Sequence, residues 1–193
     1  MALMRRRAAL AGPPVIEPPV VGGGDAAGPI AAGEKARVDL QLEVERVSRS
    51  VMVLMLRYRL DIANRSGRAI RDLEIHAELG SAGNDVPLAQ QLAMPDSALP
   101  LVETIERIGP HQSRSISGTL QVPINDLSVI MRGNTPLFVP LLKLVVSAPA
   151  MDTVAETHMA GIGGPGMSTK LQPLTLEGPP GGYNGVRSRK IER

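Results

Sequence analysis

Apolar and polar residues alternate along much of the chain between residues 38 and 122. Four runs carry an apolar residue at every second position. They are Val38, Leu40, Leu42 and Val44; Leu54, Leu56, Tyr58, Leu60 and Ile62; Leu73, Ile75, Ala77 and Leu79; and Ile116, Gly118, Leu120 and Val122. A period of two is typical of a strand with one buried face and one solvated face. The sequence therefore predicts four half-buried strands.

The stretch RYRLDIANRSGRAIRDLEIHAEL, residues 57–79, joins two of these runs through ANRSGRA. Asn, Ser and Gly tolerate tight backbone angles, so the stretch predicts a hairpin of two antiparallel strands. Arg57, Arg59 and Arg68 stand here among acidic residues. They form either an edge that contacts a partner or a solvated face with charge pairing, and the interleaved acids favour charge pairing.

The rest of the chain predicts further short strands and little helix. We expect a short helix at 88–93, a turn at 109–112, one helical turn within 124–136 and a buried strand in LFVPLLKLVVSA, where Pro140 marks a bulge or an edge. Two more strands follow, and turns recur every 8–15 residues. About seven short strands with regular turns are typical of an antiparallel, immunoglobulin-like β-sandwich. The Cys–Trp–Cys signature of true immunoglobulin domains is absent because the chain has no Cys and no Trp.

Composition divides the chain into three parts. Residues 1–34 are rich in Pro, Gly and Ala and predict a basic, flexible linker. Residues 35–178 form the predicted sandwich, and 179–193 a basic tail. From Glu34 to Glu177 there are 14 basic and 16 acidic residues, whereas the two ends hold 7 basic and 3 acidic residues. The positive charge therefore belongs to the ends, which argues against a basic groove for nucleic acid.

The sequence motifs do not indicate an enzyme. Without Cys there is no thiolate zinc site and no Cys nucleophile. GIGGPG at 161–166 fits a dinucleotide fingerprint but has no helix pattern after it, so we interpret it as a loop. The three His residues, His76, His111 and His158, are too far apart to suggest a metal site. We expect no catalytic residue, no cofactor and no metal.

The N-terminus, MALMRRRAALAGPP, has Arg5, Arg6 and Arg7 followed by too short an apolar stretch for a signal peptide. No segment approaches the roughly 18 apolar residues of a membrane span. We expect a cytoplasmic protein, with membrane association as an alternative. ALMRRR is also typical of the cytoplasmic end of a membrane helix. Three interpretations stay open: the natural protein begins upstream, it acts beside a membrane partner, or this is an ordinary disordered basic N-terminus.

Four segments carry a resemblance to a known family: residues 57–79, IGPHQSRSISGTLQVP, LFVPLLKLVVSA and KLQPLTLEGPPGGYNGV. Together they resemble uncharacterised, membrane-tethered proteins of alphaproteobacteria, especially sphingomonads. The resemblance covers about Lys35 to Val186. It implies a sandwich that follows a membrane helix, an Arg-rich stop and a Pro-rich linker; the chain has the stop and the linker but not the helix. It implies no activity, cofactor or catalytic residue.

Three functional hypotheses follow. The first is a non-enzymatic interaction module for an unknown protein partner, positioned at the cytoplasmic membrane face. The second is a ligand-binding or enzymatic domain whose site is assembled from distant residues, for which His111 or His158 beside a buried carboxylate is the expected sign. The third is a protein that binds anionic membranes through basic ends. The candidate contact residues are Arg5, Arg6, Arg7, Arg57, Arg59, Arg68, Arg187, Arg189 and Lys190. The oligomeric state is left open.

Overall fold

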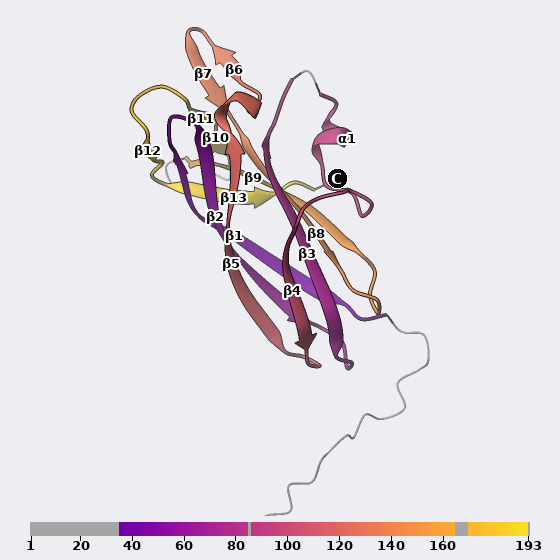
Figure 1. Cartoon of the computed structure of the whole chain (residues 1–193). Helices are drawn as coiled ribbons and strands as arrows, with labels where there is room; N and C mark the ends of the chain where they lie inside the picture. The colour runs from indigo at the N-terminus through magenta and orange to yellow at the C-terminus, as the bar shows by residue number, and fades with distance from the viewer. Residues whose placement is uncertain (1–34, 85, 165–169, 193) are drawn as a thin grey trace, which may run out of the picture.

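A computed structural model describes residues 35–84, 86–164 and 170–192 (Figure 1). The linker predicted at 1–34, with Arg5, Arg6 and Arg7, lies outside the described residues. So does part of the loop predicted at 161–166. Strands dominate the described chain. Helical structure within it is limited to α1 (Leu88–Gln91) and a 3₁₀ turn, η1 (Ile124–Asp126). Both agree with the expected positions of short helical segments.

The strands form three antiparallel sheets. The first has the order β12-β1-β2-β5, with β12 at Gly181–Gly182, β1 at Val38–Arg49, β2 at Val53–Asn64 and β5 at Ser113–Pro123. The second has the order β10-β9-β8-β3-β4, and β13 pairs with β9. Its strands are β10 (Leu171–Gln172), β9 (Val154–Gly163), β8 (Pro140–Ser147), β3 (Ile70–Ser81), β4 (Leu101–Ile108) and β13 (Val186–Lys190). The third joins β11 (Leu174–Thr175), β7 (Thr135–Phe138) and β6 (Ile130–Arg132).

One apolar core lies between the two larger sheets. The alternating residues of β1, β2 and β3 supply most of it, and Leu54, Leu56, Leu60, Leu73 and Ile75 are fully buried. Two antiparallel sheets that share one core are consistent with a β-sandwich. The prediction of a mainly β, antiparallel fold is confirmed. The prediction of about seven strands is too low, because the described residues alone contain thirteen strands in three sheets.

The hairpin predicted for residues 57–79 is wrong. β2 pairs with β1 and β5, whereas β3 pairs with β4 and β8 in the other sheet. The connection between them crosses from one sheet to the other and is held by Asn64, whose side chain is 1% exposed. Alternation shows which side chains face the core, but a hairpin and a crossover have the same pattern on their strands.

The apolar run at 137–147 has buried side chains on both faces because other parts of the chain cover both of them. Leu142 and Leu144 face the shared core, while Leu141 and Val145 are buried outside it. The segment around α1 lies by this outer face, where the backbone N–H of Ala93 donates to Thr157 Oγ1 of β9 at 2.7 Å. Pro140 begins β8 and separates it from β7.

The prediction of a free C-terminal tail at 179–193 also needs correction. Over its described part, 179–192, the chain forms β12 and β13. β12 pairs with β1 and β13 with β9 (Figure 1). Tyr183 anchors the connection: its ring meets that of Phe138 edge to face at 6.1 Å, and its hydroxyl donates to the Thr175 carbonyl at 2.7 Å. β13 is short, and the two residues that alternate with its arginines are Val186 and Ser188. Its sequence therefore has too few apolar residues to predict a strand.

None of the helical segments that the structure describes is both long enough and apolar enough to cross a bilayer.

Candidate functional site

The two lateral sides of the paired sheets differ in how far their edge strands are covered by other strands. On one side the C-terminal segment adds β12 to the first sheet and β13 to the second. Ser188 of β13 also accepts a hydrogen bond from the backbone N–H of Val44 in β1, at 3.4 Å. The C-terminal segment therefore covers this side in part: β12 pairs with Ser48 and Arg49 at the end of β1, and β13 pairs with β9 from His158 to Ile162.

The other side is open. β5 is the last strand of the first sheet and β4 the last strand of the second, and each pairs with a single neighbour among the described residues. The turn at 109–112 joins the two strands. Beside it lies a hollow of about 460 Å³. It is lined by Glu103, Thr104, Ile105, Glu106, Arg107, Arg114, Ser115 and Ile116.

The free edge of β5 is long and regular. All eleven residues pair with β2 in one unbroken register, from Val53 opposite Pro123 to Ala63 opposite Ser113. Beyond the two ends of the ladder, the N–H of Asn64 donates to the Gln112 carbonyl and the N–H of Ile124 donates to the Met52 carbonyl, both at 2.9 Å. In both contacts the residue that extends β5, Gln112 or Ile124, has an even number. Since hydrogen-bonded pairs alternate in an antiparallel ladder, even-numbered residues of β5 bond to β2.

The odd-numbered residues of β5 therefore direct their N–H and C=O groups away from β2. They are Ser113, Ser115, Ser117, Thr119 and Gln121, and all five are exposed. Pro123 ends the series, where its missing N–H costs no ladder bond. A row of free backbone groups on an edge strand is a template for pairing with another strand. Arg114 is the one charged residue of this strand.

The edge of β4 is different. Its sequence carries Glu103, Glu106 and Arg107, and its register with β3 shifts at Ile75/His76. Opposite it, Asp72 of β3 has φ +50°, an unusual conformation for a residue with a side chain. Charges and irregular register are devices that keep an edge from pairing. Of the two edges, β5 is thus the one suited to accept a strand.

Tyr58 connects the core to the open side. Its ring is 2% exposed and crosses Gly118 of β5, where an added Cβ would lie 2.7 Å from the hydroxyl oxygen. Burial raises the pKa of Tyr58, and the negative charge of Glu103 raises it further. The phenol therefore stays neutral, and Gly118 is required because a larger residue would collide with the ring.

The arginines predicted as contact residues do not form one surface. On β2, Arg57 pairs with Glu45 at 2.9 Å, and Arg59 lies 3.4 Å from Asp61 and donates to Ser115 Oγ at 3.1 Å. Charge pairing on a solvated face, the alternative favoured by the sequence, is therefore present there. The Ser115 hydrogen bond, followed by Arg59, lowers the pKa of Asp61.

The remaining predicted contact residues are spread over other elements. Arg68 lies in the connection between β2 and β3, where its carbonyl accepts from Asn64 at 2.7 Å. Arg187 and Arg189 are exposed on β13, in the second sheet. Lys190 is committed to an ion pair with Glu156 at 2.5 Å. The structure therefore brings Lys190 to a site that Arg187 and Arg189 do not line.

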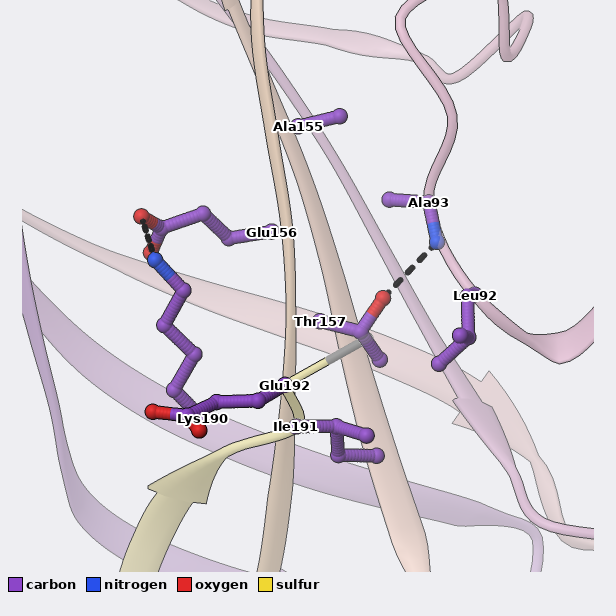
Figure 2. Close-up of a pocket in the computed structure, with 8 residues that line it drawn as sticks. All are labelled: Leu92, Ala93, Ala155, Glu156, Thr157, Lys190, Ile191 and Glu192. Atoms are coloured by element: carbon purple, nitrogen blue, oxygen red, sulfur yellow. Dashed lines mark hydrogen bonds and ion pairs between the residues drawn. The ribbon is translucent and has the colours of Figure 1, made fainter. Parts of the chain in front are cut away.

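Figure 2 shows this second site, a hollow of about 330 Å³ beside β9 and the end of β13. Glu156 points to one side of β9 and toward Lys190, while Thr157 points to the other side and meets Ala93. Glu156 Oε2 also lies 3.0 Å from His158 Nε2, and both side chains are 7% exposed. His158 is not part of the wall of the hollow.

The carboxylate of Glu156 is held charged. Burial acts to raise its pKa, but the hydrogen bonds from His158 and Lys190 outweigh that effect, so the pKa of Glu156 is lowered from its ordinary value of 4.5. Each carboxylate oxygen already has a partner, Lys190 for one and His158 for the other. The arrangement links the last strand to β9.

Sequence reasoning did not identify Glu156 as part of a site. The available signal was AETHMA, in which polar residues interrupt the inward-facing positions of a strand. His158 beside a buried carboxylate is the sign expected for a site assembled from distant residues. His111 gives no such sign, since it is exposed in the turn at 109–112 with φ +55°. Within the described part of the chain, no group of three or more His, Asp or Glu side chains is placed to hold a metal ion.

Comparison with known proteins gives no relative: no protein-family model, curated protein or solved structure matches this chain.

Proposed function

We propose that this chain is a non-enzymatic, immunoglobulin-like protein-interaction module that binds an extended protein segment by β-strand addition. The observation that supports the proposal is the free edge of β5, with five exposed residues whose backbone groups point outward. Strand addition draws its affinity from main-chain hydrogen bonds and its specificity from alternate side chains. On the opposite side of the molecule, the outer edge of β1 is paired, among the described residues, only at Ser48 and Arg49. The rest of β1 has a register shift at Val44/Arg46 and carries the charged residues Asp39, Glu43, Glu45 and Arg46, features that keep an edge from pairing.

An immunoglobulin-like character is supported by the antiparallel sheets, the single core and the crossover between β2 and β3, which is a connection found in sandwich folds. A position at the cytoplasmic membrane face rests on the resemblance to the alphaproteobacterial membrane-tethered family. Flotation of the full chain with vesicles of anionic lipid tests this placement. Loss of flotation in an Arg187→Ala/Arg189→Ala variant would assign membrane contact to β13.

Capture experiments on full-length protein test strand addition. The variant Ser117→Pro removes one outward N–H, which a bound strand needs, but breaks no bond to β2. Gln41→Lys, on the exposed face of β1, serves as the control. We expect a protein retained by the wild type and by Gln41→Lys to be lost with Ser117→Pro, while circular dichroism shows all three folded. Equal retention by all three would place binding away from β5 and contradict the proposal.

A second candidate, a ligand-binding or enzymatic domain, is favoured by the Glu156–His158 pair beside the 330 Å³ hollow. Lys190 would be the group that attracts an anion there. Titration with inorganic phosphate and with acetate, followed by thermal denaturation, tests this candidate. A concentration-dependent stabilisation that disappears in Lys190→Gln would support it. If neither anion stabilises the protein, this candidate is contradicted, and the Glu156–His158–Lys190 cluster has only the structural role of holding β13 against β9.

A further inference from the structure

The free edge of β5 has a pattern that is nearly symmetric about Gly118. On the core side, Ile116 and Leu120 lie two residues before and after it, and both are half-buried. On the solvated side, Ser117 matches Thr119 and Ser115 matches Gln121. A strand that pairs with β5 in antiparallel fashion must present apolar residues on one face and small polar residues on the other. β5 of a second copy meets this requirement from Ser115 to Gln121.

We propose that the strand added to β5 is β5 of a second copy of this chain, related by a two-fold axis through Gly118. The inference rests on the proposed function, because it names the partner of the same edge. A two-fold interface uses the same surface on both copies, so it is closed after two. The β12-β1-β2-β5 sheet of one copy would join the same sheet of the second copy into one continuous sheet across the axis.

The backbone of β5 fits this register. With the axis at Gly118, Ser117 lies opposite Thr119 of the second copy and Ser115 lies opposite Gln121. These are outward-directed residues on both strands, so their N–H and C=O groups face one another. Gly118 then lies opposite Gly118 in a non-hydrogen-bonded pair, where Cα atoms approach to about 4.5 Å. A glycine accommodates that approach, and the Tyr58 ring already excludes a larger residue there.

The charges of β5 do not oppose the pairing. Arg114, its one charged residue, lies opposite Val122 of the second copy. The two Arg114 residues are eight positions apart along the paired strands, or about 27 Å. The same argument fails for β4, because three charged residues and an irregular register interrupt its edge.

Sedimentation velocity with full-length protein tests the inference through the register. In Ser117→Lys/Thr119→Lys, each Lys lies opposite a Lys of the second copy, and like charges directly opposite destabilise a strand pair. In the matched variant Ser117→Lys/Thr119→Glu, each Lys lies opposite a Glu. We expect the wild type and the Lys/Glu variant to sediment as dimers. The Lys/Lys variant should dissociate at least about tenfold more readily, with circular dichroism unchanged.

The absence of Cys from the chain allows a second measurement of the same register. Ser117→Cys and Thr119→Cys, mixed and oxidised, place one thiol opposite the other across the axis, whereas either variant alone pairs Cys with Thr or Ser. We expect a disulfide-linked dimer mainly in the mixture. Gln41→Cys, on the exposed face of β1, mixed with either variant controls for random collision.

The outcomes separate the inference from the proposed function. A monomeric wild type at micromolar concentration overturns the second copy as partner, and capture of another protein that Ser117→Pro abolishes would still support strand addition. A dimer that both charge variants retain overturns the inference as well, because it places the contact elsewhere. Loss of both dimerisation and capture with Ser117→Pro but not with Gln41→Lys supports both.

Discussion

Replacement of Asn64 by Ala should cost this protein a large part of its stability. Asn64 is buried where two connections cross between the sheets. Its amide nitrogen donates to the carbonyls of Arg68 at 2.7 Å and Gly109 at 2.9 Å. Its amide oxygen accepts from the backbone N–H of Ser66 at 3.0 Å and from the Ser66 hydroxyl at 2.7 Å. One side chain thus ties the β2–β3 connection to the β4–β5 turn.

The magnitude follows from these four contacts. A neutral hydrogen bond contributes about 1 kcal/mol net, and a buried group left without a partner costs about 1–3 kcal/mol. The Gly109 carbonyl belongs to a buried residue, so Ala should destabilise the fold by about 3–5 kcal/mol. For a chain of this size, the melting temperature should fall by about 6–20 °C.

Urea denaturation followed by far-ultraviolet circular dichroism measures the effect, since the chain has no Trp for fluorescence. Arg65→Ala is the control from the same connection. Arg65 forms an ion pair with Asp39 at 2.7 Å, with both side chains more than 60% exposed, and should cost less than about 1 kcal/mol. A loss below about 1 kcal/mol for Asn64→Ala, with an unchanged denaturant slope, would refute the assigned role of Asn64.

Three further changes test other parts of the fold. Gly118→Ala should cost about 1–3 kcal/mol in urea denaturation through collision with Tyr58, and should cost less in a Tyr58→Leu background; equal costs would show that the ring is not the obstacle. Leu144→Ala, at a fully buried position of β8, should cost about 2–5 kcal/mol, and a smaller loss would mean that the core collapses around the cavity. The Glu156 pKa is lowered in the folded state, so its contribution is present above its ordinary value of 4.5 and lost as the pH falls through the folded pKa. Wild-type stability should therefore fall more steeply than that of Glu156→Gln as the pH falls below 4.5, and parallel curves would contradict this coupling.

The strands themselves were predictable to a large extent. Leu54, Leu56, Tyr58, Leu60 and Ile62 alternate in the sequence and are all buried. Alternation is a local property, since successive side chains of a strand point to opposite faces whatever strand lies beside it. The same reasoning missed β13, where the partner strand rather than the local sequence stabilises the extended conformation.

The candidate site was less predictable. Nothing in the sequence distinguishes β5 as an edge, because Ser113–Pro123 would alternate equally well in the centre of a sheet. Lys190 meets Glu156 and His158 of β9 only because β13 pairs with β9, with Lys190 opposite His158. The basic residues at the C-terminus were interpreted as a free tail for the same reason: Glu156, the acidic partner of Lys190, is 34 residues away.

The sequence by itself determined which residues face the core and that the chain is mainly β, because burial of apolar side chains follows a period of two along each strand. Only the tertiary structure decided which strands pair, which edge stays free and which charges meet. Backbone hydrogen bonds are the same for every residue other than proline, so the choice of neighbouring strand depends on how the two sheets pack across their shared core.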